Sequence, residues 1–236
     1  MTKKVQIGET YDEMFDIGGS DGVFDLPHKD QCYYPMFKTI FNEIQKKNIN
    51  NILEVGCGTG AFAHLIFEKS KTIYNGFDFS KVAIKKAKKR TGNNELFYFG
   101  DATKASSYNN AYQAIVCTEV LEHVEDDFSV IQNWKQGSNC FCSVPNFDSD
   151  YHVRFFLSKK DVYKRYSPLI DIEKIIVIKK PYLSNISLKN TLQAIRWNRY
   201  RPNQLIKIMG FGKKADVGCW FLIIGTKEVP PSGQDK

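Results

Sequence analysis

The chain has 236 residues, of which 42% are hydrophobic and 25% charged, and it carries a formal net charge of +7. This composition suits a globular protein with a full core, and the charge permits an anionic partner without requiring one. It contains no apolar run of the roughly 20 residues that a membrane span needs, no apolar leader near residue 1 and no Cys-x-x-Cys pair, which predicts a cytoplasmic protein with reduced thiols and no membrane span.

The first part of the chain is expected to hold two helices. A short one is expected around residues 10–16, capped by Thr10, and a turn-rich segment follows at 18–22. From Tyr34 onward, apolar residues at helical spacing predict an amphipathic helix that ends near Lys47.

A strand, a glycine-rich turn and a helix are predicted next. Ile52–Val55 is a short apolar run, Gly56-Cys57-Gly58-Thr59-Gly60 interrupts it, and residues 61–67 carry apolar side chains at helical spacing. Glycines in such a turn let the backbone approach a bound nucleotide closely. The spacing Gly-x-Gly-x-Gly differs from the dinucleotide fingerprint Gly-x-Gly-x-x-Gly, so an NAD-dependent oxidoreductase is the weaker interpretation.

Strands and helices alternate up to residue 145. We predict strands at 72–78, 95–99, 112–117 and 139–144, a basic helix capped by Ser80, and a helix that runs from the segment after residue 118 to about Trp134. Alternation of this kind is typical of a doubly wound α/β fold, whose ligands bind at the carboxyl ends of the strands. The lysines between 81 and 90 are more simply a solvated helix face than a nucleic-acid patch.

The run from Glu54 to Gly60, with acids at the later strand ends, resembles the class I S-adenosylmethionine-dependent methyltransferases, whose first motif is E/D-x-G-x-G-x-G. The likeness is a set of motifs over about residues 30–146. Within it, the segments 33–35, 76–80 and 144–154 look like those of bacterial enzymes that modify surface glycans or metabolites. It implies a seven-stranded, mainly parallel sheet with an antiparallel last strand, for which 172–178 and 219–226 are the candidate hairpin. We expect residues 1–30 to form a lid, 31–228 a single domain with helical insertions at about 148–168 and 181–216, and 229–236 a disordered tail.

The resemblance implies S-adenosylmethionine as cofactor and S-adenosylhomocysteine as product. Asp78 lies about twenty residues beyond the glycine turn, where a carboxylate meets ribose hydroxyls, and Asp101 would accept a hydrogen bond from the adenine amino group. A helix cap for Asp78 and a turn-stabilising role for Asp101 are the structural alternatives. The residues expected at the cofactor are Tyr11, Glu54, Gly56, Cys57, Gly58, Gly60, Asp78, Phe79, Asp101, Ala102 and Glu119.

The segment Glu119-Val120-Leu121-Glu122-His123 carries the expected chemistry. His123 is the expected general base, because the ordinary pKa of imidazole is near neutrality; Glu122 would act beside it at the start of a helix, and His152 could be a second base. Glu119, Glu122 and His123 could instead hold a divalent cation such as Mg²⁺, with Asn146 or His152 as a fourth ligand. Small-RNA 2′-O-methyltransferases and ubiquinone-pathway O-methyltransferases resemble this segment and use it with a metal, whereas elsewhere in the family it caps the helix or supports the cofactor loop.

The expected activity is methyl transfer to a hydroxyl, or another polar atom, of a small acceptor that contains a sugar or phosphate. Arg154 would suit an anionic acceptor, although residues 150–156 could equally be a surface loop that covers the core. The alternatives are a metal-dependent RNA 2′-O-methyltransferase and a catalytically silent cofactor-binding partner protein. The oligomeric state stays open, and a nucleic-acid partner is not expected. The residues expected to bind the acceptor are Tyr33, Tyr34, Asn146 and Arg154.

Overall fold

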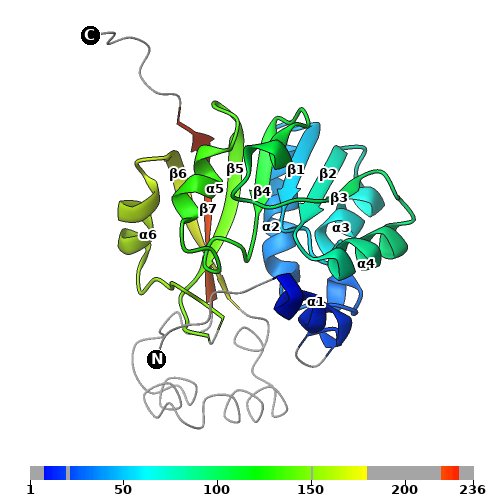
Figure 1. Ribbon diagram of the computed structural model, residues 1–236. Coiled ribbons are helices and arrows are strands. Elements are labelled where there is room, and N and C mark those ends of the chain that lie inside the picture. The colour runs from blue at the N-terminus through cyan, green and yellow to red at the C-terminus, as the bar shows by residue number, and fades with distance from the viewer. Residues whose placement is uncertain (1–7, 20–21, 150, 180–218, 229–236) are drawn as a thin grey trace, which may run out of the picture.

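The protein folds around a seven-stranded sheet with helices on both faces (Figure 1). The computed structural model describes residues 8–19, 22–149, 151–179 and 219–228. Within these the strand order is β3-β2-β1-β4-β5-β7-β6, and only β7 runs antiparallel to its neighbours. This confirms the predicted fold class. The strands are β1 (Asn51–Val55), β2 (Ile73–Asp78), β3 (Phe97–Phe99), β4 (Ala114–Cys117), β5 (Asn139–Pro145), β6 (Ile170–Lys179) and β7 (Cys219–Lys227).

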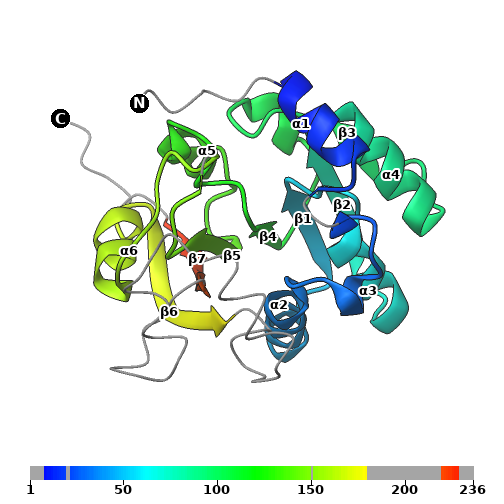
Figure 2. The ribbon, with the colours of Figure 1, turned by 90° about the horizontal axis from the view of Figure 1, so that it is seen from below.

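Two groups of helices cover the two faces of the sheet, as the view along it shows (Figure 2). Helices α2, α3 and α4 pack on one face and α5 and α6 on the other. None of the helices in the described ranges is long and apolar enough to cross a membrane. The helices are α1 (Gly8–Asp16), α2 (Tyr34–Lys46), α3 (Ala61–Lys69), α4 (Lys81–Thr91), α5 (Asp127–Gln132) and α6 (Lys159–Tyr166), with 3₁₀ turns at His28–Asp30 and Ala105–Tyr108.

The central strands are apolar on both sides because both faces of the sheet are covered. In β1, Ile52 belongs to the core under α2 and α3, whereas Leu53 and Val55 belong to the core under α5 and α6. The short continuous apolar run of β1 in the sequence therefore reflects double burial.

The segment after β4 departs most from the prediction. Helix α5 has six residues and begins only at Asp127, with the Asp126 side chain accepting a hydrogen bond from the Ser129 backbone N–H. Glu122 and His123 therefore lie in turns ahead of the helix, and the prediction that they begin it is wrong. At the front, α1 includes Thr10 rather than beginning after it.

Helix α4 confirms Ser80 as its cap, since the Ser80 hydroxyl accepts from the Ala83 backbone N–H at 3.1 Å. Lys86 donates to the Phe15 carbonyl at 2.6 Å and pairs with Asp25 at 3.0 Å. Arg90 donates to two backbone carbonyls in residues 24–26. Two cations of the basic run thus hold the chain that follows α1, which favours the structural interpretation of that run. The predicted insertion 181–216 and tail 229–236 lie outside the described residues, whereas α6 falls within the predicted insertion 148–168.

Candidate functional site

The strand order places the crevice expected for a ligand between β1 and β4. Val55 at the end of β1 pairs with Phe77 on β2 and with Cys117 at the end of β4. The chain leaves β1 toward β2 and reaches β4 on the other side, so the order of the strands reverses here. Ligands of doubly wound folds bind at such a reversal, outside the carboxyl ends of the strands. The glycine turn and the segment from Glu119 both begin at this point.

The glycines of the turn, Gly56, Gly58 and Gly60, all have backbone angles in the left-handed region. Gly56 and Gly58 have φ values of 68° and 50°, which favour glycine. A Cβ on Gly56 would lie 2.3 Å from the Val120 side chain, whereas a Cβ on Gly58 would meet only the Phe15 ring of α1, at 3.6 Å. Gly56 therefore packs against the loop after β4, whereas the Phe15 ring of α1 lies over Gly58 at ordinary contact distance. Gly60, with φ 74°, precedes α3.

Asp78 ties the end of β2 to the glycine turn. Its Oδ2 accepts from the Gly58 N–H at 2.9 Å and its Oδ1 accepts from the Ser80 N–H at 2.9 Å. Burial raises the pKa of Asp78 to about 6 against the opposing effect of these N–H groups. The Phe79 N–H also acts on this carboxylate, which has about four acceptor sites and can still accept from a ligand hydroxyl.

The next strand end places Asp101 beside its own turn. Its Oδ1 accepts from the N–H and the hydroxyl of Thr103, both at 2.8 Å, and among the described residues no hydrogen bond engages its Oδ2. The carbonyl of Ala102 accepts from the Tyr108 hydroxyl at 2.8 Å. Asp101 therefore stabilises its turn and keeps one oxygen for a ligand.

Glu54 and Cys57 are buried below the turn rather than presented to the crevice. The Tyr74 hydroxyl donates to the Glu54 carboxyl, whose residue is 3% exposed. Burial raises the pKa of Glu54 to about 8 and also raises the pKa of the Cys57 thiol. The side-chain role expected for Glu54 at the cofactor is thus corrected, since its partner is a core tyrosine.

Helix α1 covers the crevice with an aromatic side chain. The Tyr11 ring lies 4.7 Å from the Phe79 ring and 5.9 Å from the His123 ring, measured between centroids. Asp12 anchors the helix to the start of α4, because its Oδ1 accepts from the Ser80 hydroxyl at 2.5 Å and from the Val82 N–H at 3.2 Å. The Tyr11 ring therefore lies between Phe79, which follows Asp78 on the side of the glycine turn (the nucleotide side), and His123 on the other side.

Two carboxyl groups face each other after β4. Glu119 has a φ of 57°, its N–H donates to the Ser143 hydroxyl at 3.0 Å, and that hydroxyl donates to Glu119 Oε1 at 3.2 Å. Glu122 is fully buried, and no donor among the described residues reaches either of its carboxyl oxygens. Burial, and next the negative charge of Glu119, raise the pKa of Glu122 well above its usual range.

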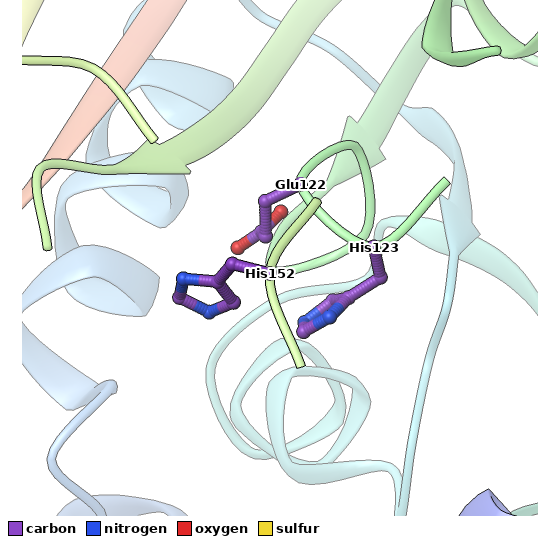
Figure 3. Close-up of side chains that lie close together, drawn as sticks. All are labelled: Glu122, His123 and His152. Atoms are coloured by element: carbon purple, nitrogen blue, oxygen red, sulfur yellow. The ribbon is translucent and has the colours of Figure 1, made fainter. Parts of the chain in front are cut away.

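Two imidazoles complete this group (Figure 3). His123 Nδ1 lies 2.8 Å from the Tyr151 carbonyl and His152 Nδ1 lies 3.1 Å from the Phe147 carbonyl. A carbonyl only accepts, so each Nδ1 carries a proton. One ligand atom each of Glu122, His123 and His152 lies within 4.8 Å of the other two. Burial lowers the pKa of His123 to about 4, so its ring is neutral near pH 7 but a weaker base than expected.

These donors could hold a cation. The Glu122 carboxyl is buried beside Glu119, whose negative charge a bound cation would offset, and imidazoles held by backbone carbonyls have the support that metal-ligating histidines usually have. We expected Glu119, Glu122 and His123 as the ligands, but the third member of the set is His152. Glu119 lies next to the set, beside Glu122. Two nitrogen donors suit a transition-metal ion better than Mg²⁺, which prefers oxygen ligands.

Three of the four residues expected at the acceptor have other partners. The Arg154 guanidinium donates to backbone carbonyls of the loop 121–125. Both amide atoms of Asn146 bond to Cys219, which also removes Asn146 as a fourth metal ligand. The Tyr34 ring lies 5.8 Å from the His28 ring. At Tyr33, burial and next the negative charge of Glu119 raise the pKa of the hydroxyl well above its usual range.

Two supporting residues carried no signal in the sequence. Ser143 is a fully buried strand residue on β5 whose hydroxyl holds Glu119, and only the pairing of β4 with β5 brings them together. Asp127 is fully buried at the start of α5, and its carboxylate accepts two hydrogen bonds from Arg165 and one from the Tyr166 hydroxyl. The pair Asp126-Asp127 could have marked the helix start, but not these distant partners.

Comparison with known proteins matches this chain to methyltransferases. A family model described as a methyltransferase domain matches residues 28–200. Over 104 residues the chain is 33% identical to a ubiquinone biosynthesis O-methyltransferase of Vibrio parahaemolyticus, an alignment that covers 40% of this chain and 43% of that protein. The chain thus spans less than half the length of this curated relative.

Solved structures show a likeness in fold over most of the chain. The N-methyltransferase NodS from Bradyrhizobium japonicum, in complex with S-adenosylhomocysteine, matches 92% of this chain and 98% of its own with a TM-score of 0.59 and 16% identity. The [4+2]-cyclase SpnF matches 95% of this chain and 96% of its own with a TM-score of 0.63 and 15% identity. Because one of these two is a cyclase, the chemistry has to be argued from the site.

Proposed function

The chain belongs to the methyltransferase domain family, as a class I S-adenosylmethionine-dependent methyltransferase, and from this we propose that it methylates a hydroxyl oxygen of a small acceptor. One observation carries the proposal. Two imidazoles and a buried carboxyl, on His123, His152 and Glu122, converge at the carboxyl ends of β4 and β5 beside the glycine turn. A base next to the donor site is what methylation of a hydroxyl requires, since the hydroxyl proton must leave.

The cofactor fits the residues of the β1–β4 crevice. When bound, S-adenosylmethionine supplies an electrophilic methyl group. The glycine turn would lie beside its amino-acid portion, the remaining acceptor capacity of Asp78 would meet its ribose, and the second oxygen of Asp101 would meet its adenine amino group. Tyr11 would cover the reacting end. Alignment of the acceptor oxygen with the methyl group is then the largest contribution the protein makes.

Without a bound cation, His123 is the proposed proton acceptor. Its Nε2 lone pair is fixed by the hydrogen bond from Nδ1 to Tyr151, and burial keeps the ring neutral near pH 7. The same burial lowers its basicity, so removal of a proton from an alcohol needs help. A bound divalent cation would lower the pKa of the acceptor hydroxyl. We propose that Glu122, His123 and His152 hold such an ion, and that Co²⁺, Mn²⁺ or Zn²⁺ suits them better than Mg²⁺. The Nε2 lone pair of His123 would then bind the ion, and the acceptor hydroxyl, with its pKa lowered, would lose its proton to solvent.

A thermal melting series tests cofactor and cation separately. S-adenosylhomocysteine at about one hundred times its Kd should raise Tm by several degrees, and NADH should not. Co²⁺ should add a second rise that a chelator removes and that is smaller with Mg²⁺. A rise with NADH alone would contradict the family-based cofactor. No response to any divalent cation would contradict the metal proposal while leaving the methyl transfer proposal standing.

Acceptor chemistry is tested with S-adenosylmethionine that carries a deuterated methyl group. We expect label on oxygen when catechols, sugars and amines are offered as separate panels, and loss of label in His123→Ala. Label on an amine nitrogen would overturn the oxygen proposal. A protein that binds the cofactor but labels nothing, in vitro or in a metabolite extract, would favour a catalytically silent partner protein.

The RNA 2′-O-methyltransferase alternative is less well supported. Lys86 and Arg90 of the basic helix hold the segment 15–26, which leaves fewer cations for phosphates. RNA binding that weakens steeply with salt would revive this alternative. As to organisation, we propose that residues 1–30 act as the lid and 31–228 as the catalytic domain of a cytoplasmic enzyme.

A further inference from the structure

The loop 119–125, which carries Glu119, Glu122 and His123, is held by hydrogen bonds from the segment after β5. Inside the loop, the His123 N–H donates to the Val120 carbonyl at 2.9 Å. From the other segment, the Val153 N–H donates to the Glu122 carbonyl at 2.8 Å, and the Tyr151 carbonyl accepts from His123. The loop is therefore shaped by partners about thirty residues away in the sequence.

Arg154 makes the largest share of these contacts. Its Nη1 donates to the carbonyls of Leu121 and Val124, the latter at 2.5 Å, and its Nη2 donates to the Glu125 carbonyl at 2.5 Å. The Arg154 side chain is 14% exposed. Three carbonyls on either side of the Glu122–His123 pair thus converge on one planar guanidinium. A lysine ammonium cannot reproduce this, because it is a compact point charge without the fork of N–H donors.

Asp127 balances the charge of this guanidinium. Its Oδ2 lies 3.4 Å from Arg154 Nη1, while Arg165 donates to both Asp127 oxygens at 2.9 and 2.6 Å. Arg165 makes no recorded contact with the carbonyls of the loop in the described chain. The two arginines therefore share a buried carboxylate, but only Arg154 contacts the loop.

We propose that Arg154 is a positioning residue that fixes the loop 119–125 in the shape that brings Glu122 and His123 next to His152. The proposal builds on the proposed function, since it assigns the loop its role there. The guanidinium takes no part in binding the acceptor or in moving a proton. Its role is to hold three carbonyls and hence the backbone between them.

Hydrogen–deuterium exchange of the full-length protein tests this without cofactor, metal or acceptor. In Arg154→Lys, the amides of 119–125 should exchange about tenfold faster than in wild type, because the loop opens locally. Arg165→Lys is the matched control, as it weakens the same carboxylate pair, and should change these amides less than threefold. Both variants should bind S-adenosylhomocysteine within about threefold of wild type, and Co²⁺ affinity should fall tenfold only in Arg154→Lys.

Equal exchange in Arg154→Lys and wild type would overturn the proposal, and so would equal acceleration in both variants, which would make Arg154 a general stabiliser. If Arg154→Lys fails to fold, wild type in increasing urea decides the matter. The amides of 119–125 and 151–154 should then open together as one unit, and separate opening would refute the link. The exchange result stands even if the enzyme proves not to methylate oxygen.

Discussion

Glu54 offers a test of how burial below the glycine turn acts on the fold. Its pKa is raised by burial from 4.5 to about 8, and the carboxyl accepts from the Tyr74 hydroxyl. Between these two pH values the folded chain keeps a proton that the unfolded chain has lost, so stability falls as pH rises through the window. Each pH unit corresponds to about 1.4 kcal/mol, which sets an upper limit of about 5 kcal/mol for the whole window.

Glu54→Gln removes this dependence, because an amide is neutral at every pH and keeps an oxygen that accepts from Tyr74. The free energy of unfolding of the variant should match wild type near pH 4.5 and exceed it increasingly up to pH 8. Urea unfolding at half-unit steps of pH measures both curves. Parallel curves would refute the reasoning, since they would mean that Glu54 ionises normally in the fold. Affinity for S-adenosylhomocysteine at pH 6 should change less than threefold, and a large loss would restore a cofactor role to this side chain.

Three further outcomes follow from the site. Gly58→Ala should cost only about 1–2 kcal/mol of stability, because its φ is left-handed, yet calorimetry should show S-adenosylhomocysteine binding weakened at least tenfold. Gly56→Ala should cost more stability in urea unfolding, because its Cβ would meet Val120 at 2.3 Å. Glu122→Gln should abolish the Tm rise with Co²⁺ while the rise with S-adenosylhomocysteine persists. Asp127→Asn should lower the free energy of unfolding by no more than about 3 kcal/mol, the lower end for breaking a buried pair, because the carboxylate is buried while the two guanidinium groups that it balances are only partly so.

The nucleotide side of the site could be predicted because its rules are local. A glycine turn directly after a buried strand, and an acid at the end of the next strand, need only the alternation of strands and helices to become neighbours. The bond from the Gly58 N–H to Asp78 joins residues that the fold class alone brings together. Glu54 does not fit this account. Because side chains alternate along β1, its side chain points into the core, where it accepts from Tyr74.

The acceptor side could not be predicted in the same way. Residue type and position after a strand predict that Arg154 and Asn146 bind the acceptor. Their actual partners are carbonyls about thirty residues earlier and, for Asn146, Cys219 at the start of β7. No spacing in the sequence specifies such pairs. The helix after β4 was placed too early for a related reason, because Leu121 is apolar on account of loop burial rather than helical periodicity.

This difference bears on how the two sides of the site tolerate change. On the nucleotide side the ligand would meet backbone groups of the glycine turn, and few side chains can alter them except by steric conflict, as at Gly56. On the other side the loop with Glu122 and His123 depends on a guanidinium and a carboxylate from separate elements. A substitution between residues 145 and 158 can therefore reshape the acceptor side while leaving the glycine turn intact. Specificity for a new acceptor is accordingly more accessible through this segment than through the residues that would hold the methyl donor.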